Sequence, residues 1–212
     1  MPRILPGETD IYALTDSRLA LGRSVEEQAR ALLSAGVKIL QYREKHAHAE
    51  VMLEECRMLR RLTLEAGACF IVNDHIDIAM LVDADGVHVG QDDIPVPEVR
   101  RLLGPDKIIG LSTHSPDQAR AAVAAGADYI GVGPIFATQT KEDVGAPVGF
   151  SYLEWVVANI HHPFVAIGGI KEHNIAEVTK RGAACCALVS ELVGAPDIAA
   201  KVRAVRAAMH RS

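Results

Sequence analysis

The feature that most constrains this chain is a repeated alternation between short β-branched segments and longer segments with helical periodicity. Eight strand-like segments recur along the 212 residues, at positions 11–15, 38–43, 69–73, 86–89, 108–112, 129–133, 164–167 and 184–189. Helical patterns lie between them, among them 24–35, 49–66, 116–125, 152–159 and 174–181. Because strands separated by helices are too far apart in sequence for tight hairpins, the alternation predicts a parallel sheet with helical crossovers.

A weak internal repeat supports these boundaries. A Gly followed by a small residue closes several helical patterns just before the next strand, at Gly36, Gly67, Gly126 and Gly182. Gly readily adopts the left-handed conformation that ends a helix, so each pair marks a helix-to-strand junction. Helix starts are also readable, since Ser24 with Glu27 forms a capping-box pattern and Pro116 stands at a first helical position.

Repeated strand–helix units of this number and length predict an α/β fold with one (β/α)₈ barrel domain, a TIM barrel, spanning residues 1–212. An open, doubly wound sheet is the main alternative. That fold usually carries Gly-x-Gly-x-x-Gly after its first strand, whereas this chain has Thr15-Asp16-Ser17 there. No linker-like segment divides the chain. We therefore expect an active site at the C-terminal ends of the barrel strands.

Composition and charge narrow the function classes. Hydrophobic residues make up 49% of the chain and charged residues 23%, as in ordinary globular proteins. A net charge of −5 argues against a nucleic-acid partner, which would favour a basic face. The chain has no apolar stretch of about 18 residues and no signal-peptide pattern at its start, so we expect no membrane association and a cytoplasmic location. The spacing of the four cysteines fits neither a zinc site nor a disulfide framework, which predicts buried free thiols.

Polar side chains cluster where the strands are expected to end, beginning with the second strand. Gln41, Arg43 and Lys45 are spaced by two, so they project to one side of an extended chain. An unpaired cation inside a barrel is costly, and an anionic ligand would remove that cost. The alternative is a strand end that rises into solvent, with these cations paired to Glu44.

Carboxylates follow the third and fourth strands. Asn73 and Asp74 end the third strand, and Asp92 and Asp93 follow the fourth. Carboxylates at adjacent strand ends can hold Mg²⁺ together with substrate phosphate oxygens. A single Asn-Asp pair is often only a turn or a helix cap, but two acidic loops beside a cationic strand indicate a metal site.

The remaining strand ends carry small, hydroxyl and cationic residues. Ser112 ends the fifth strand, with His114 beside it as a minor acid/base candidate. The segment 134–143 after the sixth strand combines hydroxyls with a cation, as a loop that covers a substrate would. Gly168-Gly169 and Val189-Ser190 end the last two strands, where barrels of this type recurrently bind phosphate.

These motifs, in this order, resemble those of the thiamin phosphate synthase family, whose members join the two halves of vitamin B1. The resemblance extends from Tyr12 to about Val193. It rests on Gln41-x-Arg43-x-Lys45, Asn73-Asp74, Gly90-Gln91-x-Asp93, Gly110-x-Ser112, Thr138-x-Thr140-Lys141, Gly168-Gly169 and Val189-Ser190. Two positions depart from the family pattern: Tyr42 replaces a commoner aliphatic residue, and Ala137 stands where Pro is usual.

The resemblance implies a transferase that joins hydroxymethylpyrimidine diphosphate to a thiazole phosphate, releasing diphosphate and giving thiamin monophosphate. The residues it implies for the pyrimidine diphosphate are Gln41, Arg43, Lys45, Asn73, Ser112 and Lys141. Those for the thiazole phosphate are Thr138, Thr140, Gly168, Gly169, Val189 and Ser190. It also implies Mg²⁺ bound by Asp74 and Asp93. We expect Lys141, Ser112 and Arg43 to contribute most directly to catalysis.

The family's reaction is dissociative: diphosphate leaves first, and the thiazole nitrogen attacks a short-lived pyrimidine cation. No side-chain nucleophile is needed, which agrees with the lack of a Ser-His-Asp or Cys-His pattern. One alternative is a thiazole tautomerase that uses only the phosphate site, with His114 as acid/base; another is a non-enzymatic phosphate sensor. The full set of cationic and acidic residues favours the synthase. The expected partners are small-molecule substrates, and a homo-oligomer remains open.

Overall fold

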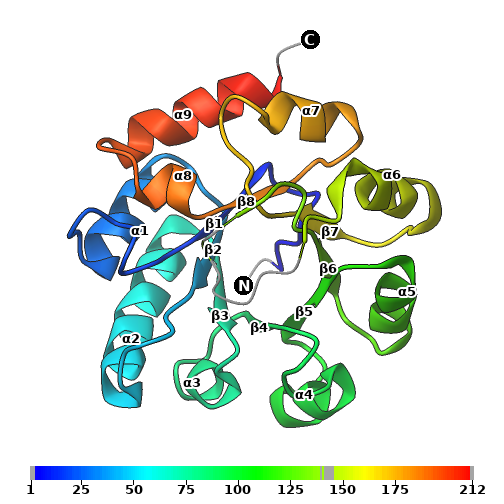
Figure 1. Cartoon of the computed structure of the whole chain (residues 1–212). Coiled ribbons are helices and arrows are strands. Elements are labelled where there is room, and N and C mark those ends of the chain that lie inside the picture. The colour runs from blue at the N-terminus through cyan, green and yellow to red at the C-terminus, as the bar shows by residue number, and fades with distance from the viewer. Residues whose placement is uncertain (1–2, 139, 141–145, 211–212) are drawn as a thin grey trace.

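A computed structural model describes residues 3–138, 140 and 146–210 of the chain. Eight parallel strands in this part of the chain close into a barrel in the order β1 to β8, and helices surround them (Figure 1). The strands are β1 Ile11–Leu14, β2 Ile39–Tyr42, β3 Cys69–Asn73, β4 Gly86–Val89, β5 Ile108–Thr113, β6 Tyr129–Val132, β7 Phe164–Ala166 and β8 Cys186–Leu188. The predicted (β/α)₈ barrel is therefore confirmed.

The described helices are α1 Val25–Ser34, α2 Ala49–Ala66, α3 Ile76–Leu81, α4 Val96–Leu103, α5 Pro116–Ala124, α6 Gly149–Asn159, α7 Ile175–Lys180, α8 Ser190–Val193 and α9 Ile198–Met209. The capping box of Ser24 and Glu27 is present at the start of α1. Gly36, Gly67 and Gly182 adopt positive φ angles after their helices, as the repeat predicted. None of the helices in the described ranges is long and apolar enough to cross a membrane.

Strand alternation divides the apolar side chains between two layers. In β1, Ile11 and Ala13 pack into the layer between the barrel and the helices, whereas Tyr12 and Leu14 belong to a second cluster inside the barrel. Tyr129 of β6 joins that inner cluster. The inner layer therefore contains aromatic side chains that carry hydroxyl groups, although the chain is poor in aromatic residues.

Aspartates placed just before strands fix the N-terminal end of the barrel. Asp85 precedes β4, accepts a hydrogen bond from the Phe70 N–H and pairs with Arg60 of α2 at 2.9 Å. Asp10 precedes β1 and pairs with Arg206 of α9. Ion pairs at this end tie helices to strands, and the opposite end is left for ligands.

The four cysteines are buried and unpaired, as predicted. Burial raises the pKa of the Cys56 thiol to about 12, and it raises the pKa of Cys186 to about 12 as well. These thiols therefore stay protonated at neutral pH and act as small apolar side chains.

Candidate active site

A cavity of about 620 Å³ opens at the C-terminal ends of the strands. It gathers nearly all of the predicted site residues, namely Gln41, Arg43, Lys45, Asn73, Asp74, Asp93, Ser112, Thr138, Thr140, Gly168, Gly169, Val189 and Ser190. Lys141, the remaining prediction, lies outside the described residues. Segments that are far apart in the sequence thus meet around one cavity, because parallel strands bring all their C-terminal ends together.

The polar side chains at the end of β2 point into this cavity, as their spacing predicted, and each has a definite partner. The Arg43 guanidinium pairs with Asp16 at 2.8 Å, and the two side chains are only 12% and 5% exposed. Lys45 Nζ lies 2.5 Å from Asp74 Oδ2. These cations are therefore held by carboxylates from neighbouring strand ends and not by Glu44.

Glu44 has a different role. Its carboxylate accepts hydrogen bonds from the backbone N–H groups of Lys45 and His46 at 2.8 and 2.9 Å. Burial opposes its ionisation, but these bonds and one from Ser17 outweigh burial and lower the pKa of Glu44. Glu44 therefore stays ionised and stabilises the turn after β2.

Asp16 is a site residue that sequence reasoning missed. It follows β1, and its Oδ1 atom accepts backbone hydrogen bonds from Arg18 and Leu19 at 3.0 and 3.1 Å. These bonds fix the carboxylate that orients Arg43. The signal was present in the sequence, since Asp16 ends a strand just as Asp74 does.

The carboxylates Asp74 and Asp93 line the cavity from adjacent strand ends. Asp74 has a φ of 61°, a left-handed conformation that Asp tolerates better than most residues. Asp93 Oδ2 accepts a hydrogen bond from the Gly90 N–H at 2.6 Å. No group of three or more His, Cys, Asp or Glu residues in the described ranges could hold a metal alone. The carboxylates of Asp74 and Asp93 are oxygen donors of the kind that hard cations such as Mg²⁺ prefer.

His88 is a second residue that sequence reasoning missed. It lies in the middle of β4, where Val87 and Val89 pack toward the helices and His88 points inward. Its Nδ1 atom is 2.9 Å from the Tyr129 hydroxyl, and its Nε2 atom is 2.9 Å from Ser112 Oγ. The inward position of a polar residue between two valines was the signal that could have identified it.

The opposite side of the cavity is formed by the turns after β7 and β8. Gly168 and Gly169 have φ angles of 101° and 63°. A Cβ atom on Gly169 would lie 2.6 Å from the backbone oxygen of Ala137, so these glycines also let the segment after β6 approach closely. Thr138 Oγ1 lies within hydrogen-bond distance of the Thr140 hydroxyl, at 3.2 Å.

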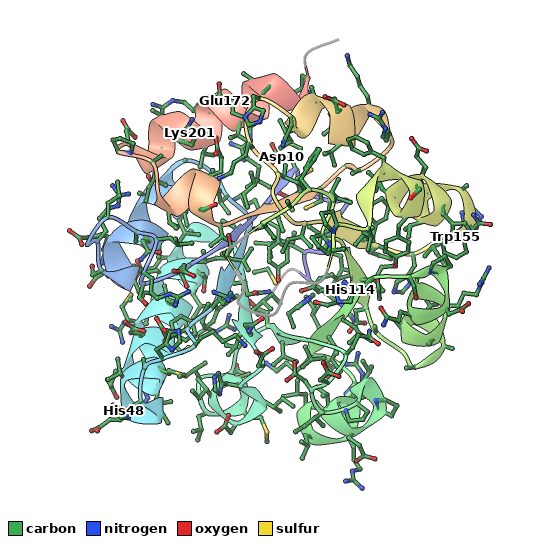
Figure 2. All side chains as sticks on the ribbon, in the orientation of Figure 1. Asp10, His48, His114, Trp155, Glu172 and Lys201 are labelled. Carbon is green, nitrogen blue, oxygen red and sulfur yellow. The ribbon has the colours of Figure 1, made fainter. Side chains whose placement is uncertain are left out.

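Lys171 does not line the cavity, but it contacts Ser190, which does. Its Nζ donates a hydrogen bond to Ser190 Oγ at 2.9 Å and lies 3.4 Å from Glu191 Oε2. Lys201 also contacts Glu191 and pairs with Glu172 at 2.8 Å; Figure 2 shows Glu172 and Lys201 next to one another. Lys171 was not predicted from the sequence, because it stands two residues beyond the glycine pair.

His114 also lines the cavity. Figure 2 shows it much nearer the barrel than His48 and Trp155, which lie at the outer edge. The His114 Nδ1–H group donates to the Gly133 carbonyl at 2.6 Å. This bond fixes the orientation of the ring at the barrel mouth, and Nε2 is the ring nitrogen that takes no part in it.

Comparisons with known proteins agree on one family. A family model described as thiamine monophosphate synthase matches residues 11–192. The chain is 63% identical over 204 residues to a thiamine-phosphate synthase of Pelotomaculum thermopropionicum, covering 96% of this chain and 94% of the relative. It is 58% identical over 212 residues to the enzyme of the same name from Lawsonia intracellularis, covering 99% and 98%.

A solved structure agrees with these sequence matches. The thiamine phosphate pyrophosphorylase of Pyrococcus furiosus superimposes with a TM-score of 0.86 at 36% identity, with 94% of each chain covered. The two sequence relatives carry the synthase name and the solved structure carries the pyrophosphorylase name, so the comparisons do not support the tautomerase alternative. The chain belongs to the thiamine monophosphate synthase family.

Proposed function

We propose that the cavity joins hydroxymethylpyrimidine diphosphate to a thiazole phosphate, releasing diphosphate and giving thiamin monophosphate, with Mg²⁺ as the cofactor. One observation carries this proposal: a single cavity has paired cations and carboxylates on one side and the Gly168-Gly169 and Ser190 turns on the other. Its volume of about 620 Å³ suits small-molecule ligands, since such sites generally measure about 300–1,000 Å³.

The pyrimidine diphosphate belongs at the ends of β2 to β5. Gln41, Asn73 and Ser112 would bind the pyrimidine half, and Arg43 and Lys45 would bind the diphosphate. Asp16 already orients the Arg43 guanidinium, so little side-chain freedom is lost when it binds an anion. Lys141, which lies outside the described residues, would bring a further cation to the leaving group.

Asp74 and Asp93 would hold the metal. Mg²⁺, when bound, neutralises part of the negative charge that grows on the leaving diphosphate. Lys45 now occupies one oxygen of Asp74. On ligand binding, Lys45 would leave this carboxylate and donate to a diphosphate oxygen, so the ion pair would keep both groups placed before the substrate arrives.

The thiazole phosphate belongs on the other side of the cavity. Backbone N–H groups of Gly168, Gly169 and Ser190 would bind its phosphate, with the hydroxyls of Thr138 and Thr140 nearby. Lys171 lies within hydrogen-bond distance of Ser190 Oγ and would add a positive charge there. The thiazole nitrogen would then face the pyrimidine methylene across the centre of the cavity.

If the bond to diphosphate breaks before the thiazole attacks, no side-chain nucleophile is needed. Water must then be excluded from the site, because the pyrimidine cation would otherwise react with water. The segment 134–143 would cover the bound substrates, a role supported by Thr138 and Thr140, which line the cavity wall; residues 139 and 141–143 lie outside the described residues.

Measurement of diphosphate release from the purified protein tests the proposal. Rapid release should require the pyrimidine diphosphate, the thiazole phosphate and Mg²⁺ together, and excess chelator should abolish turnover. Full turnover in chelator would rule out the metal assignment. Isomerisation of the thiazole phosphate alone, without diphosphate release, would instead indicate a tautomerase.

A further inference from the structure

A continuous chain of hydrogen bonds crosses the interior of the barrel beneath the cavity. Gln41 Nε2 donates to the Tyr12 hydroxyl at 2.8 Å, and this hydroxyl lies 2.8 Å from that of Tyr129. The Tyr129 hydroxyl is 2.9 Å from His88 Nδ1, and His88 Nε2 is 2.9 Å from Ser112 Oγ. The chain therefore connects two predicted substrate-binding residues, Gln41 and Ser112, through three residues without an assigned role.

The number of protons gives this chain a direction. The Tyr12 oxygen accepts a hydrogen bond from Gln41 Nε2, which can only donate, so the Tyr12 O–H donates to the Tyr129 oxygen. The Tyr129 O–H then donates to His88 Nδ1, which must be unprotonated to accept this hydrogen bond. A neutral imidazole carries one proton, so that proton lies on Nε2 and is donated to Ser112 Oγ.

Burial keeps the tyrosines able to donate. Tyr12 and Tyr129 are 2% and 1% exposed. Burial raises the pKa of both phenols well above the ordinary value of 10. Both hydroxyls therefore retain their protons at neutral pH and can act as hydrogen-bond donors.

We propose that Tyr129 and His88 are positioning residues. Tyr129 holds His88 as the Nε2–H tautomer, and His88 thereby directs the Ser112 hydroxyl proton toward the ligand. Ser112 Oγ already accepts from His88, so its own proton is available to an acceptor atom in the cavity. The ligand half bound at Ser112 must then present a hydrogen-bond acceptor, as a ring nitrogen of a pyrimidine does. The identity of that ligand rests on the proposed function, whereas the assignment of the His88 tautomer does not.

Nitrogen-15 NMR of histidine-labelled protein tests the tautomer without substrate. A His88→Gln variant identifies the His88 signals among the nine histidines. In the unmodified protein, Nδ1 should show the shift of an unprotonated nitrogen and Nε2 that of a protonated one. Tyr129→Phe removes the donor to Nδ1 and should shift His88 toward the other tautomer. A protonated Nδ1 in the neutral ring of the unmodified protein would overturn the proposal.

Kinetics test whether the chain acts through Ser112. Loss of one directed hydrogen bond is worth about tenfold, so Tyr129→Phe should lower kcat/KM for the pyrimidine diphosphate by about that factor. In a Ser112→Ala background the same change should have less than about a twofold effect, because the group that it directs is gone. Equal effects of Tyr129→Phe in both backgrounds would overturn the positioning role.

Tyr152→Phe is the matched control for removal of a buried hydroxyl. Its hydroxyl donates to Thr113 Oγ1 at 2.7 Å, and its side chain packs in the outer layer. It should leave both the His88 tautomer and kcat/KM unchanged. If the protein lacked synthase activity, the NMR result would still decide the tautomer, so failure of the proposed function and failure of this inference are distinguishable.

Discussion

Gly110 of β5 determines whether the hydrogen-bond chain inside the barrel has room to form, and Gly110→Ala should break it. A Cβ atom at this position would lie 2.2 Å from Tyr129 Cζ and 2.5 Å from both the Tyr129 hydroxyl oxygen and His88 Nδ1. All three atoms belong to the chain. The added methyl group would therefore collide with the two rings whose contact sets the His88 tautomer.

The size of the effect follows from these contacts. To restore ordinary van der Waals contact, the Tyr129 ring must retreat by roughly 1.3–1.8 Å within a packed interior. Overpacking of this kind costs about 1–3 kcal/mol, and a lost buried hydrogen bond adds about 1 kcal/mol. We expect Gly110→Ala to lower the free energy of unfolding by about 2–4 kcal/mol, a large fraction of the stability of a typical domain.

Gly131→Ala on the neighbouring strand is the matched control. A Cβ atom there would lie 3.4 Å from His88 Cε1, which is an ordinary contact, so its cost should stay below about 1 kcal/mol. Urea unfolding measures the difference: the midpoint for Gly110→Ala should fall by about 0.7–2 M, because m-values are about 2–3 kcal/mol/M for domains of this size. Equal midpoints for the two variants would refute the packing argument.

Three further predictions concern separate parts of the molecule. Lys141→Ala should lower the single-turnover rate with saturating substrates by about 10²–10³ with much less effect on binding, because a cation at the leaving group acts mainly in the transition state; near-normal bond cleavage would remove Lys141 from the mechanism. Lys171→Ala should raise the KM for the thiazole phosphate about fivefold to tenfold and that for the pyrimidine diphosphate less than about twofold, through loss of a partly exposed charge; equal effects on both would indicate a general defect. Burial opposes ionisation of Asp10, but Arg206 and the Ile11 N–H outweigh burial and lower the pKa of Asp10 below the ordinary 3.8. The ion pair of Asp10 with Arg206 therefore stabilises the fold above pH 3.8, and this stabilisation is lost as the pH falls through the lowered pKa. Asp10→Asn should therefore cost about 1 kcal/mol at pH 7 in denaturant unfolding, with the difference from the unmodified protein shrinking below about pH 4; a difference independent of pH would exclude the ionic explanation.

The fold was predictable because its signals are local. Most strands lie in short apolar segments, many of them with β-branched residues, and glycines such as Gly36 and Gly182 mark the helix ends where the structure has positive φ angles. The grouping of site residues was predictable for a related reason. Once the barrel is assumed, every residue at a C-terminal strand end must face the same cavity, so Arg43 and Asp74 could be placed together without coordinates.

The partners inside the site were not predictable in the same way. Arg43 pairs with Asp16 and Lys45 with Asp74, and these choices depend on the register and tilt of strands β1 to β3, which strand patterns do not specify. Glu44 was a plausible partner by proximity in sequence, but it points the other way and caps backbone N–H groups.

His88 illustrates the same limit. Its inward position follows from the alternation of side chains along β4. Its contact with Tyr129 of β6, however, reaches across β5 and depends on the absence of a side chain at Gly110. A strand pattern can show that a polar residue faces the interior. It cannot show which hydroxyls on other strands will meet that residue.

The central claim is that one cavity holds both substrates and couples cleavage of one to capture by the other. The most direct measurement is the amount of thiamin monophosphate formed per diphosphate released by the purified protein with both substrates and Mg²⁺. We predict a ratio close to one, because the thiazole nitrogen, and not water, captures the pyrimidine cation. A ratio far below one, or no diphosphate release at all, would contradict the account.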